Sequence, residues 1–175
     1  ILKGNTSGDL WTVCRELSCR MLMLAGIGDR EKCAELVDEA VSSGEALRRF
    51  EMMVKSQGGD VSYIENTSKF KKASFSREVY APADGYINHM DSENIGLTAV
   101  LLGAGREKKE DNIDPAAGIV ISAKTGDFVK RGELLATLFS NDKSRLDDAE
   151  TRYLSAVSIG AQKPAAQPMI LDYID

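Results

Sequence analysis

The run Gly103-Ala104-Gly105-Arg106 is the stretch of this sequence best suited to contacting a ligand or another domain. Glycines allow the backbone to approach a partner closely, and an arginine guanidinium offers a planar fork of donors for an anion or for carbonyl oxygens. The same four residues also fit a simple helix end followed by a solvent-facing arginine. The pattern leaves both interpretations open.

Other groups that could do chemistry are isolated. His89 is the only histidine, and it lies outside any nucleophile or metal-ligand spacing, so we expect a surface or interface histidine rather than a general acid. Asp114 and Asp127 supply too few oxygen ligands for calcium, and the Thr125-Gly126-Asp127 run favours a hairpin turn. We therefore name no catalytic residue and no metal ligand.

Composition excludes several classes of protein. Hydrophobic residues make up 43% of the chain and charged residues 28%, which is typical of globular domains. The net charge of -5, with no basic stripe, argues against nucleic acid as a partner, and no apolar run is long enough for a membrane span. Three cysteines without CxxC spacing favour structural thiols in a reducing cytoplasm, with Cys14 and Cys33 on apolar helix faces.

The elements that must position these residues fall into two groups. Apolar residues at three-and-four spacing predict three helices between residues 7 and 57, the second of them capped by Asp29. The polar stretch 60–76 reads as a linker. Beyond it, short apolar runs separated by Gly and Pro turns predict strands between residues 78 and 139 and an edge strand at 169–173, with a short helix over 95–102 and a longer one over 142–159.

Two segments of this second group carry a resemblance. Residues 81–87 (Ala-Pro-Ala-Asp-Gly-Tyr-Ile) and 126–136 resemble the two halves of a barrel-sandwich hybrid, the fold of biotinyl and lipoyl domains. Between them lie the Leu102-Gly103-Ala104-Gly105-Arg106 loop, Asp114 and the Gly118-Ile119-Val120 run. Together with the upstream Ser56-Gln57-Gly58-Gly59-Asp60 run, this order resembles the C-terminal part of pyrimidine-nucleoside phosphorylases, the thymidine phosphorylase family.

The resemblance implies an α+β organisation in three parts. Residues 1–60 would be a helical segment from the end of a large α/β domain, 61–76 a linker, and 77–175 the C-terminal domain with its barrel-sandwich-hybrid-like (biotinyl/lipoyl-like) core. Since the chain opens on Ile1, we expect a fragment. Its partners would be the upstream α and α/β domains of the same polypeptide, in an enzyme that is a homodimer in the cytoplasm.

The resemblance also implies an activity for the whole enzyme. Phosphate, as co-substrate, attacks the anomeric carbon of a thymidine or uridine nucleoside, which gives the free base and a pentose 1-phosphate. The catalytic and base-reading groups, and the ligands of the potassium ion that some members bind, lie upstream of this sequence. We expect the fragment to be inactive alone and to carry no cofactor, with residues 103–106 contributing to closure of the active-site cleft.

Two other classes of function compete with this expectation. A biotin or lipoate carrier would present a lysine in a tight hairpin flanked by methionines, whereas Lys124 and Lys130 stand in other turns without methionine neighbours. A stand-alone binding domain could use the apolar faces of the three predicted helices.

Overall fold

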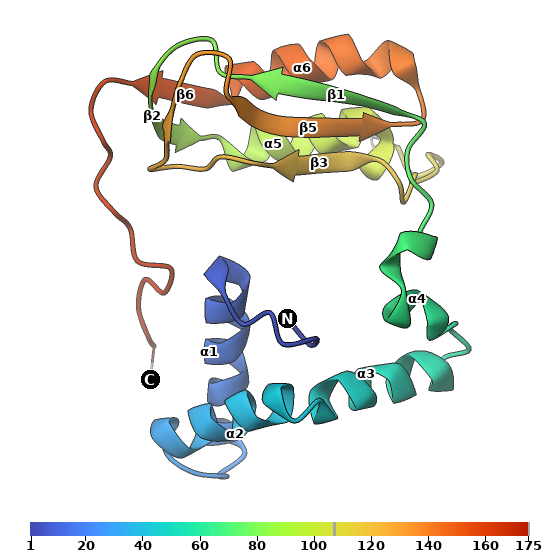
Figure 1. Ribbon diagram of the computed structural model, residues 1–175, viewed down its shortest axis with the longest axis vertical. Helices are drawn as coiled ribbons and strands as arrows, with labels where there is room; N and C mark the ends of the chain where they lie inside the picture. The colour runs from blue at the N-terminus through green and yellow to red at the C-terminus, as the bar shows by residue number, and fades with distance from the viewer. Residues whose placement is uncertain (107, 175) are drawn as a thin grey trace. The chain divides into compact units, whose positions relative to one another are not determined.

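The computed structural model describes residues 1–106 and 108–174 (Figure 1). These residues form two compact units. The helical unit consists of residues 1–69 together with the described residues from 167 onward, and the β unit consists of residues 70–166. The division at residue 70 lies inside the stretch 61–76 that the sequence predicts as a linker, and the described residues from 167 onward group with the helical unit.

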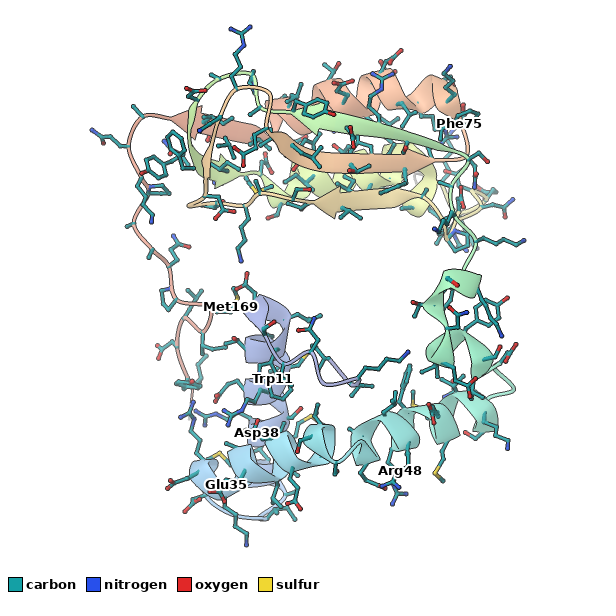
Figure 2. All side chains as sticks on the ribbon, viewed as in Figure 1. Trp11, Glu35, Asp38, Arg48, Phe75 and Met169 are labelled. Atoms are coloured by element: carbon teal, nitrogen blue, oxygen red, sulfur yellow. The ribbon has the colours of Figure 1, made fainter. Side chains whose placement is uncertain are left out.

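The helical unit contains the three helices that the apolar spacing predicts: α1 (Gly8–Leu24), α2 (Arg30–Ser42) and α3 (Glu45–Ser56). Asp29 caps α2 as expected, because its Oδ1 accepts from the Lys32 amide at 2.9 Å. Two short turns of helix follow, α4 (Ser62–Glu65) and η1 (Thr67–Lys69), so the stretch predicted as a linker contains local helical structure. Figure 2 shows Glu35 and Asp38 projecting from α2 and Arg48 from α3.

Polar side chains tie α1 to α2. Arg15 donates two hydrogen bonds of 2.7 Å to Asp38, and Arg30 donates one of 2.8 Å to the buried Glu16. The predicted apolar face of α1 is largely uncovered in this chain. Its exposed members are Leu10, Leu17, Met21 and Leu24.

The thiols differ in burial. All three cysteines are free, and Cys19 and Cys33 are buried whereas Cys14 is only half-buried. Cys14 lies on the predicted apolar face of α1, whereas the buried side of this helix is the one that carries Glu16 and Cys19. Burial raises the pKa of Cys19, which keeps this thiol protonated.

The β unit is built from two antiparallel three-stranded sheets. One has the order β1-β5-β3 and the other β4-β2-β6. The strands are β1 (Phe75–Tyr80), β2 (Gly85–Met90), β3 (Gly118–Ile121), β4 (Phe128–Val129), β5 (Leu134–Ser140) and β6 (Val157–Gly160).

Neighbouring strands along the chain are not the strands that pair. Val79 of β1 is opposite Ala136 of β5, and Gly85 of β2 is opposite Val129 of β4. Each sheet therefore combines a strand from residues 75–90 with one from residues 118–140. The mixed α and β content of the prediction is confirmed.

Helices cover the sheets and close one core. They are α5 (Ser92–Ala99), η2 (Val100–Ala104), η3 (Lys143–Arg145) and α6 (Leu146–Ser155). Figure 1 shows α6 lying along β1 and β5, and Figure 2 places Phe75 at the start of β1. The core residues with almost no exposure include Val79, Ile87, Leu102, Leu135, Leu138 and Tyr153.

Two predictions about the end of the chain were wrong. The helix expected over 142–159 ends at Ser155, and residues 157–160 form β6 against β2. The edge strand expected at 169–173 does not form, since these residues have no strand partner. Within the described residues, the helices are too short or too polar to cross a bilayer.

Candidate functional site

The loop that carries Gly103 and Arg106 leaves the end of α5 through a single wide helical turn. This turn, η2, has π-helical hydrogen bonding, and Gly103 within it adopts φ 109° and ψ 1°. Side chains rarely tolerate this left-handed region, so glycine is required there. Gly105 is extended, and a Cβ on it would lie 2.6 Å from Cγ2 of Val100. Both glycines therefore set the path of the backbone.

Three successive carbonyl oxygens of this turn are held by groups from elsewhere in the β unit. Ser140 Oγ donates to the Leu102 oxygen at 2.8 Å, and Arg145 Nη1 donates to the Leu101 oxygen at 3.1 Å. The Asp114 amide donates to the Gly103 oxygen at 2.9 Å. The end of a helix normally leaves such carbonyls unpaired, so these bonds fix the turn against the end of β5.

Asp114 connects the loop to the first strand. Its Oδ2 accepts from Asn141 Nδ2 at 2.8 Å, and its Oδ1 accepts from the Ala116 amide at 2.9 Å. Asn141 Oδ1 in turn accepts from the amide and the hydroxyl of Ser74, at 2.8 and 2.7 Å. This carboxylate therefore organises loops, and its oxygens are occupied by donors of the protein.

The capping residue before η3 supports the same anchor. Asp142 accepts from the Ser144 amide at 3.0 Å, from the Ser144 hydroxyl and from Arg145 Nε. The hydrogen bond from the Ser144 hydroxyl is the largest cause that holds the pKa of Asp142 below its usual value, followed by the Ser144 amide and then Arg145. A charged Asp142 orients Arg145 toward the Leu101 carbonyl.

Arg106 stands at the end of this anchored loop with its side chain exposed. Among the described residues it has no hydrogen-bond or ion-pair partner. The loop therefore has a fixed base, formed by residues 101–103, and an exposed cationic end. Such an arrangement can present a guanidinium to an anion or to carbonyl oxygens of another domain.

The other sequence candidates lie apart from this loop. His89 is exposed on β2, beside a register shift in the pairing with β6. Asp127 Oδ2 accepts from the Lys124 amide at 2.8 Å and caps its own turn, as expected for a structural hairpin. Asp114, the other carboxylate considered as a calcium ligand, accepts a hydrogen bond from Asn141 instead.

Sequence reasoning missed the groups that hold the loop, namely Ser140, Asn141 and Arg145. A signal was present, because a Ser-Asn-Asp run directly follows the apolar strand at 134–139 and precedes a helix. Such a run predicts capping side chains at a strand-to-helix junction. It does not indicate that the carbonyls bound by Ser140 and Arg145 lie about forty residues earlier in the chain.

Comparison with known proteins places this loop in a recognised domain. A family described as pyrimidine nucleoside phosphorylase C-terminal domain matches residues 86–160, which include the loop and all of its anchors except Ser74. A curated pyrimidine-nucleoside phosphorylase from Geobacillus stearothermophilus is 35% identical over 174 residues, which are 99% of this chain and 40% of the relative.

A second relative agrees with the first. The pyrimidine-nucleoside phosphorylase of Staphylococcus aureus strain USA300 is 38% identical over 159 residues, which are 90% of this chain and 36% of that protein. The chain thus spans well under half the length of these relatives. The resemblance inferred from the sequence is confirmed: the chain is similar over nearly its whole length to pyrimidine-nucleoside phosphorylases, and residues 86–160 match the model of their C-terminal domain.

Proposed function

We propose that this chain is the C-terminal portion of a pyrimidine-nucleoside phosphorylase, a pentosyltransferase of nucleoside salvage. The parent reaction converts a pyrimidine nucleoside and phosphate into the free base and a pentose 1-phosphate. The similarity that extends over 99% of this chain but 40% of a relative carries the proposal. The groups that bind phosphate and the base, and any potassium site, are then expected in the part of the enzyme that this chain does not span.

The role proposed for this portion is closure of the cleft rather than chemistry. The three held carbonyls give the loop a rigid base, and Arg106 is exposed at its end. A rigid loop with an exposed cation can meet an opposing domain in the closed state and exclude water there. The uncovered apolar face of α1 supports packing against the remainder of the α/β domain.

The strand pairing supports a barrel-sandwich hybrid for the β unit. Each sheet takes strands from both halves of the unit, as two wrapped hairpin motifs would require. A carrier function is not favoured, because the Lys130 amide donates to Glu133 and the Lys124 amide to Asp127, which places both lysines in capped structural turns. We further propose a cytoplasmic homodimer for the whole enzyme.

Recombination tests the assignment. The purified chain alone should release no base from thymidine or uridine in the presence of phosphate, and activity should appear when the upstream portion is supplied separately or in one polypeptide. Phosphorolysis by the chain alone, or failure of the full-length protein to release base from any pyrimidine nucleoside, would overturn the proposal.

The closure role has its own test in the full-length protein. If Arg106 makes a charged hydrogen bond only in the closed state, worth about 1.5–3 kcal/mol, then Arg106→Ala should lower kcat/KM by about 10- to 150-fold. Lys109→Ala, an exposed cation three residues further along, serves as the matched control and should change kcat/KM by less than about threefold. If the two variants lower kcat/KM equally, Arg106 has no role in closure and the loop is only the end of a helix.

A further inference from the structure

The chain crosses between its two units twice. It leaves the helical unit after residue 69 and, once the β unit is complete, returns to the helical unit after residue 166. The returning segment, residues 161–174, contains neither helix nor strand. Its grouping with the helical unit therefore depends on side-chain contacts rather than on backbone pairing.

Tyr173 makes the most specific of these contacts. Its ring centroid lies 4.3 Å from the guanidinium carbon of Arg20 and 5.9 Å from that of Arg30. Both distances are within the range of about 6 Å over which a cation is attracted to an aromatic face. The two arginines belong to different helices, α1 and α2, so one ring contacts both.

A buried carboxylate holds the two guanidinium groups in place. Glu16, which is 8% exposed, accepts a hydrogen bond of 2.8 Å from Arg30 Nη2, and its other oxygen lies 3.4 Å from Arg20 Nε. The hydrogen bond from Arg30 is the largest cause that lowers the pKa of Glu16, so this group stays charged near neutral pH. Glu16 therefore holds both guanidinium groups that Tyr173 contacts.

We propose that residues 161–174 are a strap that joins the two units a second time and is closed by Tyr173 on Arg20 and Arg30. The first crossing, residues 70–74, has an extended length of at most about 18 Å, and as a single linker it would permit rotation about itself. A second connection removes rotations that a single linker permits. Pro164 and Pro168 stiffen the strap because each fixes its own φ angle.

The strap does not depend on the proposed enzymatic function, and it can be tested on this chain alone by ¹⁵N relaxation. Tyr173→Ala removes both cation–π contacts, and loss of the nearer one alone should raise the population of released tail about two- to fivefold. Tyr173→Ala should therefore lower the heteronuclear NOE of residues 167–174, shorten the rotational correlation times of both units and remove the ring-current shift from the Arg20 side chain.

Two variants serve as controls. Leu171→Ala, which removes an 80% exposed side chain from the same tail, should behave as the wild type. Tyr173→Phe keeps the ring over the guanidinium groups but removes the hydroxyl that also interacts with Arg30, so it should release the tail less than Tyr173→Ala does. An unchanged tail NOE in Tyr173→Ala would show that Tyr173 is not the clasp. A released tail with unchanged correlation times would show that the segment does not restrain the units.

Discussion

The Ser140 hydroxyl should carry much of the stability of the anchored loop. Ser140 is 1% exposed at the end of β5, and its Oγ donates to the Leu102 carbonyl at 2.8 Å and accepts from the Asp142 amide at 3.1 Å. Each bond contributes about 1 kcal/mol, and a buried carbonyl left without a donor costs about 1–3 kcal/mol. We therefore expect Ser140→Ala to destabilise the β unit by about 2–3 kcal/mol.

Native-state hydrogen exchange is the suitable assay, because a chain of two units need not unfold in a single step. The amides of β1 and β5 should lose protection by about 30- to 150-fold, and the amides of residues 101–106 should exchange faster still. Ser158→Ala is the matched control. Its side chain is exposed and its hydroxyl donates only a 3.4 Å hydrogen bond to the His89 carbonyl. We therefore expect Ser158→Ala to lower the free energy of unfolding by less than about 0.5 kcal/mol. If the two serine variants lose equal protection, Ser140 does not anchor the loop.

Three further predictions concern the same unit. Gly103→Ala should lower the stability of the β unit by about 1–2 kcal/mol, because residue 103 has a positive φ. Gly96→Ala, in open space on α5, should raise it by about 0.5–1 kcal/mol. Hydrogen-exchange protection that changes in the same direction in both variants would contradict this. The Tyr153 hydroxyl is buried without a partner among the described residues, so Tyr153→Phe should raise the free energy of unfolding by about 1 kcal/mol; a decrease would show that the hydroxyl is bonded. Because the pKa of Asp142 is depressed, its contribution is complete above the unfolded value of about 3.9 and is lost as pH falls through the folded value; a carboxyl NMR titration midpoint at or above 3.9 would refute the Ser144 contact.

The helical unit shows what local pattern can predict. The periodicity of α1, α2 and α3 and the Asp29 cap were visible in the sequence, because helix hydrogen bonds and caps are made between residues close in the chain. The turn at Asp127 was predictable for the same reason. The loop at Gly103 was recognised from its glycines, although the π-helical turn was not.

The failures depend on partners distant in the chain. Val157 is four residues after Tyr153, so it fits the face of α6, yet it begins β6 and pairs with Met90 of β2. The apolar residues 169–173 look like a strand, but they form none and group with the helical unit, whose described residues contain no sheet. The anchors Ser140 and Arg145 bond to carbonyls about forty residues away, and no spacing rule identifies such targets.

The two crossings at residues 69/70 and 166/167 also determine how this polypeptide can be divided. The β unit, residues 70–166, is one uninterrupted segment of the chain. The helical unit is discontinuous, so a truncation at residue 69 would discard the segment that carries Tyr173. A recombinant helical unit that keeps this segment needs a linker in place of residues 70–166.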